Sequence, residues 1–496
     1  MKGDLHMTEA NREPQQRPHI LFITTDELRK MTLSCYGGRS VNTPHIDAIG
    51  EKGIRFDSAY TASPWCLPSR CAMLTGQFPH NSGAYSNFRK CELSAGIPNM
   101  FQAFGGNGYQ TALIGKCHFT PVPYKETRPD VTLPYDEFRD YYMSLGLDHL
   151  DLQDDKQVSV WFYDDYAKEL DAAGYLEAYR RDTWDIKGKS KVFPFPGPEE
   201  WHPDSWVGRK ALSYIENYDA DTPLFAWVSF SGPHYPFDAP ESYYDRVDMT
   251  QDEPRRVRDG ELDDPQRIHY RSMHGPGNID GAGAAPERAC KNYTEAYWHE
   301  LRRNYYANMA QIDDYVGQIV QAAERKFGGN VLVIFTADHG EMLGNHGIWG
   351  KNDCMYEDVW NVPLLVRYPE TGGAAETAEL HGVVTDARVM LTDIMATCLA
   401  AAGLPEVPGD GRDFLQSMRD GGHRYVFAEG EGFIAVSDGT LKYVQTQKDG
   451  LAYAEMFDLS NDPHEYENIV EKPEYAAPLA RLRKAIIDHF MPKLLA

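Results

Sequence analysis

Four runs of apolar, β-prone residues, each followed at once by polar side chains, place the strongest constraint on the fold of this chain. They cover residues 19–25, 109–115, 224–230 and 330–337. Continuous apolar runs of this length are typical of strands that are buried on both faces of a sheet. Ligands of open α/β sheets bind at the carboxyl ends of the strands. The pattern therefore predicts an α/β fold with a functional site where these runs end.

The residues that follow the four runs are of the types that bind ions and move protons. In chain order they are Asp26, Glu27, Lys116, His118, His234, Asp338 and His339. Alternation along a strand would place Lys116 and His118 on one face, where a cation and an imidazole suit an oxyanion site with a proton acceptor. Asp338 with His339 suits a divalent ion or a phosphatase-like site. Taken singly, each also has a plain structural explanation, such as a helix N-cap, a solvated surface residue or an inert loop histidine.

A cysteine at the predicted start of a helix marks a fifth segment. Pro68 suits the first turn of a helix that begins at Cys66, and Arg70 follows about one turn later. The free N–H groups and the dipole at a helix start favour an anion. From the residues alone, Cys66 is a low-pKa nucleophile, one half of a redox pair with Cys71, or a buried thiol.

The whole string around this cysteine resembles a known signature. Cys-x-Pro-Ser-Arg followed by Leu-Thr-Gly, at residues 66–76, resembles the motif of the type I sulfatases. Segments near residues 26, 116, 234 and 338 resemble further motifs of that family, in the family's order. The resemblance implies the fold of the alkaline phosphatase superfamily. This is an α/β fold with a mixed central sheet flanked by helices, and a small C-terminal antiparallel sheet plus helix.

The resemblance also implies a modified cysteine and a metal ion. In the family this cysteine is oxidised to Cα-formylglycine, and the hydrate of that aldehyde is the nucleophile. Asp26, Asp338, His339 and the modified Cys66 would hold a divalent cation. Many relatives have a second aspartate where this chain has Glu27, which is expected to be a further ligand. Oxygen ligands favour Ca²⁺, with Mg²⁺ and Mn²⁺ as alternatives.

The remaining matched residues are expected to bind the substrate. By the resemblance, Arg70, Lys116 and Lys351 would donate to the sulfate oxygens. His234 would lie near the leaving oxygen, and His118 would take a proton from the hydrate so that sulfate is expelled. The alcohol product and inorganic sulfate would then leave.

Three functions follow from these residues. The first is a sulfatase that acts on a small aryl, alkyl or carbohydrate sulfate ester, and it requires a partner enzyme that converts Cys66 to formylglycine. The second is a phosphonate monoester or phosphodiester hydrolase of the same superfamily. The third is a noncatalytic binder of sulfated ligands in which Cys66 stays a thiol.

Charge and hydropathy exclude several partners. The formal net charge of -25 argues against nucleic acid and anionic lipid as partners, because both are bound by basic faces. No run approaches the roughly 18 apolar residues of a membrane span. Residues 1–17 lack the apolar segment of a secretion signal, and the eight cysteines are scattered through the chain. These features predict a cytoplasmic protein with reduced thiols.

The domain organisation is predicted from the same patterns. We expect a disordered tail over 1–17, a catalytic domain over 18–415 and a C-terminal subdomain over 416–496. The subdomain would contain strands at 425–428, 433–436 and 441–445 and a final helix at 475–494. Two segments are expected to shape the substrate pocket. They are an aromatic insertion over 130–204, most of whose rings would pack in the core, and a mobile loop or lid over 241–291.

Overall fold

A computed structural model of the chain describes most of its 496 residues. The described ranges are 17–87, 90–121, 133–184, 192–219, 221–261, 290–351, 354–370, 379–448 and 451–495. Apart from Arg17, the expected N-terminal tail lies outside these ranges. So do residues 262–289 of the expected lid and parts of the aromatic insertion. The predicted domain boundaries and the lid therefore stay predictions.

The four apolar runs form the centre of one mixed sheet. They are β1 (His19–Asp26), β4 (Gln110–Gly115), β8 (Leu224–Pro233) and β9 (Val331–Ala337). Adjacent members of the order β9-β1-β8-β4 pair in parallel. Among the described residues the sheet has eight strands, and β10 (Leu364–Arg367) pairs antiparallel with β9. The predicted α/β class with a mixed central sheet is confirmed.

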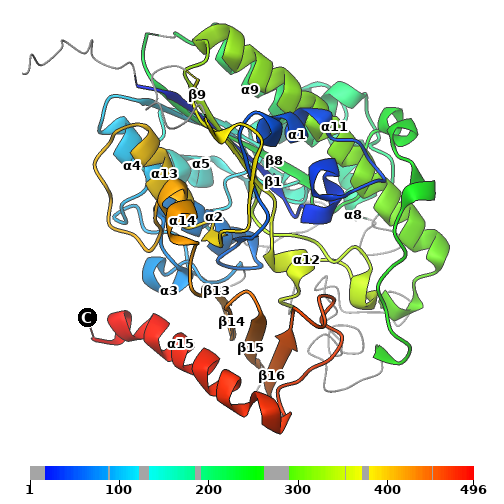
Figure 1. The fold of residues 1–496 in the computed structure, drawn as a ribbon. Helices are drawn as coiled ribbons and strands as arrows, with labels where there is room; N and C mark the ends of the chain where they lie inside the picture. The colour runs from blue at the N-terminus through cyan, green and yellow to red at the C-terminus, as the bar shows by residue number, and fades with distance from the viewer. Residues whose placement is uncertain are drawn as a thin grey trace, which may run out of the picture.

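Both faces of this sheet are buried, which is why its central strands are continuously apolar. Alternate residues of β1 enter two different hydrophobic cores, Leu21 and Ile23 one of them and Ile20 and Phe22 the other. The first core is closed by α1 (Pro44–Glu51), α9 (Pro203–Asn217) and α11 (Glu295–Phe327), and the second by α2 (Cys66–Thr75), α4 (Met100–Gly105) and α13 (Asp393–Ala401). Figure 1 shows these two groups of helices on opposite sides of the sheet.

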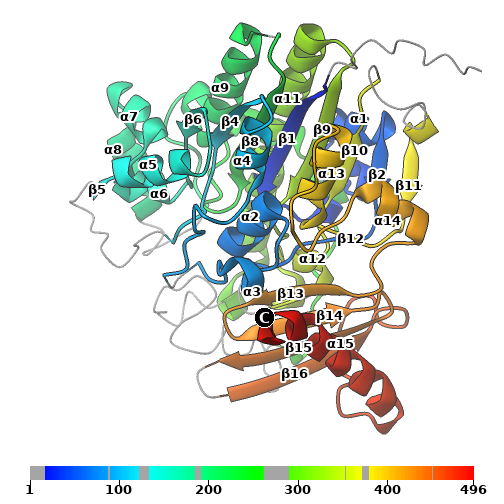
Figure 2. The same ribbon diagram turned by 90° about the vertical axis from the view of Figure 1, so that its left-hand side faces the viewer.

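A second, smaller sheet follows near the C-terminus. Its antiparallel strands are β13 (Val426–Gly430), β14 (Phe433–Ser437), β15 (Leu441–Lys448) and β16 (Leu451–Asp458). The helix α15 (Ala476–Leu495) contacts β14 and β15. Figure 2 shows this sheet and helix below the main body. The first three strands and the helix were predicted, and β16 was not.

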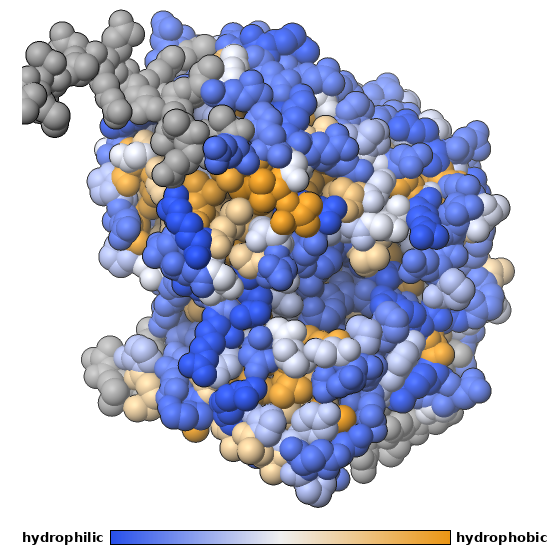
Figure 3. Space-filling model, in the orientation of Figure 1, coloured by the Kyte–Doolittle hydropathy of each residue, from blue (hydrophilic) through white to orange (hydrophobic). Residues whose placement is uncertain are grey.

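The surface agrees with the polar composition of the chain. Hydrophilic residues cover most of the face in Figure 3. Within the described ranges, no helix is both long and apolar enough to cross a membrane.

Candidate active site

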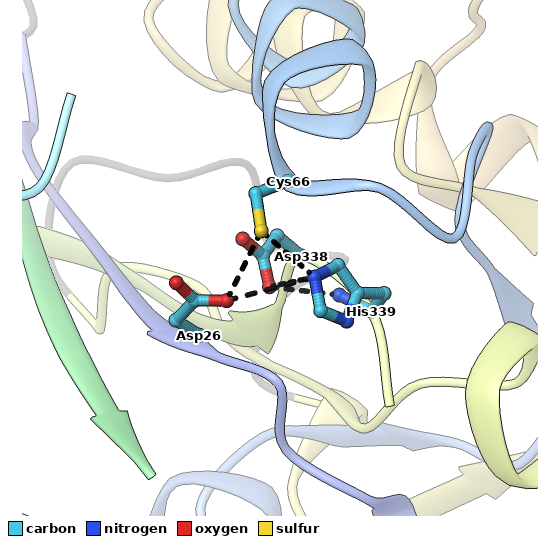
Figure 4. A group of neighbouring side chains, drawn as sticks. All are labelled: Asp26, Cys66, Asp338 and His339. Carbon is cyan, nitrogen blue, oxygen red and sulfur yellow. Dashed lines mark hydrogen bonds and ion pairs between the residues drawn. The ribbon is translucent and has the colours of Figure 1, made fainter. Parts of the chain in front are cut away.

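Four potential metal-binding side chains converge where the central strands end. Asp26 is the last residue of β1, Cys66 is the first residue of α2, and Asp338 and His339 directly follow β9. One ligand atom from each lies within 4.8 Å of the others. Cys66 Sγ is 3.1 Å from His339 Nε2 and 3.6 Å from Asp26 Oδ1. Figure 4 shows the four side chains pointing toward one another.

Local structure explains this convergence. Because β1 and β9 are parallel neighbours, their carboxyl ends meet, and the Asp338 N–H donates to the Thr25 carbonyl at 3.2 Å. The Ser69 hydroxyl donates to the Asp338 carbonyl at 2.6 Å, which fastens the first turn of α2 to the end of β9. The helix begins at Cys66, as the sequence predicted. The thiol is thereby directed at the two carboxylates.

The four side chains fit a divalent cation. His339 Nδ1 lies 3.0 Å from the Gly340 carbonyl, so it carries the proton, and Nε2 is left as an acceptor facing the carboxylates. His339 Nε2 is 3.6 Å from Asp26 Oδ1 and from Asp338 Oδ1. All four side chains are buried. Asp26 and Asp338 are buried carboxylates that lie close together, so their negative charges repel each other unless cations compensate them.

Two cationic side chains also contact these carboxylates. Arg70 Nε donates to Asp338 Oδ2 at 2.8 Å, and Lys116 Nζ donates to Asp26 Oδ2. Burial alone would raise the pKa of Asp26, but the charges of Lys116, Arg70 and Lys351 outweigh it and hold that pKa well below its usual range. Asp26 is therefore ionised, which suits a metal ligand.

Glu27 lies beside this group and binds different residues. Its Oε2 accepts from Lys351 Nζ at 2.9 Å and lies 3.2 Å from His234 Nε2. Burial, with a contribution from Glu341, raises the pKa of Glu27 well above its ordinary value. Glu27 is not among the four residues whose ligand atoms converge. Its role as a further metal ligand stays a prediction.

Lys116 and His118 are close to the site, but the strand argument for them is wrong. The strand β4 ends at Gly115, and both residues lie beyond it. Gly115 has φ +108°, which ends the regular strand geometry, and a Cβ there would lie 2.0 Å from the Ser229 carbonyl oxygen. His118 follows with φ 52°. The pair is brought to the site by a turn and not by strand alternation.

His118 and His234 are buried and neutral. Burial lowers the pKa of His118 well below its ordinary value, and the charges of Lys116 and Arg70 lower it further. Both ring nitrogens of His118 lack a hydrogen-bond partner among the described residues. Burial and the charge of Lys351 also lower the pKa of His234, whose Nδ1 lies 2.6 Å from the Tyr235 carbonyl oxygen. A neutral imidazole can accept a proton, as the predicted role of His118 requires.

Cys66 does not have the properties of a thiolate nucleophile. Burial and the charge of Asp26 raise the pKa of its thiol, so the proton is retained. Cys66 and Cys71 are both free thiols in this structure, which excludes a disulfide between them. Of the three interpretations open from the residues alone, a buried thiol describes the unmodified side chain best.

Sequence reasoning missed two carboxylates on the same side of the site. Asp155 Oδ2 accepts from Lys116 Nζ at 2.6 Å, and Asp154 Oδ1 accepts the backbone N–H groups of Cys117 and His118 at 3.0 and 2.7 Å. They follow β6 (His149–Leu152), the strand next to β4 in the sheet. The rule that located the other residues, polar groups directly after a strand, would have found them. This strand was not predicted, because it lies in a segment rich in aromatic and acidic residues and does not stand out as an apolar run.

Comparison with known proteins places the chain among sulfatases. The family Sulfatase matches residues 18–404. The chain is 27% identical over 489 residues to the uncharacterised sulfatase YidJ of Escherichia coli strain K12, covering 96% of this chain and 87% of that protein. It is 26% identical over 493 residues to an arylsulfatase of Clostridium perfringens, covering 95% of this chain and 94% of that protein.

The fold is shared with solved structures of related enzymes. The phosphonate monoester hydrolase of Agrobacterium radiobacter superposes with a TM-score of 0.74, at 24% identity and with 95% of each chain covered. This likeness concerns the fold, and it agrees with the alkaline-phosphatase-like architecture expected from the sequence.

Proposed function

This chain belongs to the sulfatase family of sulfuric ester hydrolases, and we propose that it hydrolyses a small sulfate ester by means of a formylglycine made from Cys66 and a divalent cation. The observation that carries the proposal is the convergence of Asp26, Cys66, Asp338 and His339 within 4.8 Å. The start of one helix and the ends of two strands meet there, and together they bring the four side chains to one point. A structural role alone would not require this set of buried charges, because each ion pair costs desolvation energy.

Asp26, Asp338 and His339 would hold the cation beside residue 66. The carboxylate oxygens suit Ca²⁺, with Mg²⁺ or Mn²⁺ as alternatives. A cation bound there supplies positive charge to the nucleophile and to a sulfate oxygen. Formylglycine, as its hydrate, supplies two hydroxyl groups on one carbon. A separate maturation enzyme would have to make it from the cysteine.

The surrounding side chains would bind the sulfate group and move protons. Arg70, Lys116 and Lys351 are buried cations, and each forms an ion pair with a carboxylate of the site. They would donate to sulfate oxygens as charge develops in the transition state. Neutral His118 would accept a proton from residue 66, and His234 Nε2 would face the leaving oxygen.

Mass and kinetics together test this proposal. Conversion of Cys66 to formylglycine lowers the intact mass by ~18 Da. We expect that the converted protein, loaded with Ca²⁺, hydrolyses nitrophenyl sulfate, and that protein made without the maturation enzyme does not. Equal turnover by the converted and unconverted proteins would contradict the proposal. Binding of sulfated ligands without turnover by the converted protein would instead support a noncatalytic binder.

A phosphonate monoester or phosphodiester hydrolase is the second candidate. It is favoured by the fold shared with the phosphonate monoester hydrolase. The contacts favour sulfate, because Lys116 and Lys351 are both present at the site. We therefore expect kcat/KM for nitrophenyl sulfate to exceed kcat/KM for a nitrophenyl phosphodiester. The reverse order would favour the second candidate.

Asp155 is predicted to position Lys116. The Lys116 ammonium lies between Asp155 and Asp26, so Asp155 competes with Asp26 for it. In Asp155→Asn we expect Lys116 to bind Asp26 more tightly, which opposes cation binding by Asp26. We expect kcat/KM to fall by about 10–100-fold and the apparent Ca²⁺ affinity to fall with it.

The matched control for this prediction is Asp151→Asn. Asp151 lies on β6 and pairs with His149 and Lys210 outside the site. We expect its kcat/KM and Ca²⁺ affinity to stay within about twofold of the original protein, as for most surface substitutions. Unchanged Ca²⁺ affinity in Asp155→Asn would show that Asp155 does not act through Lys116 and Asp26.

A further inference from the structure

A second group of potential metal ligands lies where the C-terminal sheet meets the main body. His80 belongs to α3 (Pro79–Ser82), Glu429 to β13 and His489 to α15. Their ligand atoms lie within 4.8 Å of one another. His80 Nδ1 is 2.6 Å and His489 Nε2 is 3.4 Å from the same oxygen, Glu429 Oε1. None of the three belongs to the candidate active site.

The ion-pair partners of Glu429 differ from those of several other buried carboxylates of this protein. Asp338 is paired with Arg70, Asp238 with Lys156 and Glu465 with Lys442. Among the described residues, the ion pairs of Glu429 are with two histidines instead. An imidazole balances a carboxylate only when it is protonated, whereas lysine and arginine do so at any ordinary pH. The cluster therefore has ligand atoms for a cation but no permanent positive charge.

Aromatic rings surround the cluster on several sides. The His489 ring stacks on Phe427 with centroids 4.0 Å apart and meets the edge of Phe78 at 4.5 Å. Phe490 lies 4.8 Å from the His80 ring. The side chains of His80, Glu429 and His489 are 13%, 6% and 8% exposed, so little of the cluster is in contact with water. Rings held by such packing are oriented before any ion binds.

We propose that His80 Nδ1, Glu429 Oε1 and His489 Nε2 form a binding site for a transition-metal ion of the Zn²⁺ type, with water as the fourth ligand. Two imidazoles and one carboxylate are a ligand set that zinc accepts in proteins. Imidazole ligands suit zinc, copper and nickel, whereas Ca²⁺ and Mg²⁺ prefer oxygen. The site therefore differs in metal preference from the carboxylate-rich group at Asp26 and Asp338.

The distances require only a small rearrangement. Bonds to zinc are about 2.0–2.2 Å long, so two of its ligand atoms lie at most about 4.4 Å apart. The two nitrogens already lie within 3.4 Å of the shared oxygen. Binding would move the His80 nitrogen and the carboxylate oxygen slightly apart and replace each ring proton on that side by the metal. Affinity should consequently fall as the pH is lowered and the rings are protonated.

A metal at this position would connect three distant parts of the chain. It would join α15, close to the C-terminus, to α3, which follows shortly after the nucleophile helix α2. An ion that binds only the folded chain stabilises it by mass action. The expected effect of zinc is therefore a higher unfolding temperature, with α15 held more firmly against α3.

Zinc binding by the full chain in the presence of excess Ca²⁺ tests the inference. Calcium occupies the oxygen-rich group, and zinc is then titrated by calorimetry, with bound metal measured by elemental analysis. We expect the original protein to bind one more equivalent of zinc than Glu429→Gln. Glu429→Gln keeps a side-chain oxygen that can accept hydrogen bonds from the His80 and His489 rings, but it lacks the negative charge of the carboxylate ligand. Its zinc affinity at this site should fall by more than the 10–100-fold typical of residues around the ligands.

Two further variants make the result decisive. His489→Gln removes a second ligand and should lose the same zinc equivalent, and zinc should no longer raise its unfolding temperature. His381→Gln removes an exposed histidine outside the cluster and should behave as the original protein does. Equal zinc stoichiometry and affinity in all four proteins would overturn the inference and show that the cluster is only a hydrogen-bonded contact.

Discussion

Replacement of Cys66 by serine is expected to stop multiple turnover and to trap a covalent sulfate adduct. Serine has nearly the shape of cysteine, so the packing of α2 should be preserved, and its hydroxyl would face the same carboxylates and His339. Attack on sulfur by this hydroxyl would form a seryl sulfate. A formylglycine hydrate carries a second hydroxyl, whose deprotonation expels sulfate, whereas serine has none. The adduct is therefore expected to persist.

Burst kinetics and mass measure this outcome. With nitrophenyl sulfate, Cys66→Ser should release at most one equivalent of nitrophenol, slowly, and gain the mass of one sulfate group at residue 66. Cys66→Ala should release none. Cys71→Ala, a change five residues further along α2 in a hydrophobic core, should keep turning over. Sustained turnover by Cys66→Ser would rule out the formylglycine mechanism.

The central fold could be predicted from sequence because its strands are buried on both faces. Such strands, represented by β1 and β9, consist of apolar residues along their whole length and stand out against their polar flanks. The strand β6, four residues long and half-buried, lacks this contrast and was missed. The strand β16 was missed for a related reason, since part of it is only half-buried. Strands that are short or only half-buried give a weak hydrophobic pattern.

The site could be predicted as a set of residues but not as a set of contacts. The parallel pairing of β1 and β9 explains why Asp26 and Asp338 meet. Which lysine or arginine pairs with which carboxylate depends on turns in the backbone. Sequence periodicity does not describe such turns. The turn at Gly115 directs Lys116 toward Asp26 and Asp155. Glu27, with φ 64°, lies at a second such turn and points toward Lys351.

Replacement of Asp338 by asparagine is expected to cost both activity and stability. The guanidinium of Arg70 is fully buried, and its Nε donates to Asp338 Oδ2 at 2.8 Å. Asparagine can still accept the Glu27 and His339 N–H groups through the oxygen that replaces Oδ1. The amide nitrogen of the asparagine would then face Arg70 Nε, so that two hydrogen-bond donors would lie opposite each other. Removing one partner of a buried ion pair costs about 3–5 kcal/mol of unfolding free energy.

A double variant separates the ion pair from the metal ligand. Arg70→Met removes the charge that Asp338→Asn leaves unpaired, so Arg70→Met/Asp338→Asn should be more stable than Asp338→Asn alone, measured by urea unfolding in the presence of a chelator. Activity should not return, because the double variant lacks both a metal ligand and a sulfate-binding cation. If the losses of unfolding free energy in Arg70→Met and in Asp338→Asn add up to the loss in the double variant, Arg70 and Asp338 are not energetically coupled. Recovered activity in the double variant would show instead that Asp338 serves only to neutralise Arg70.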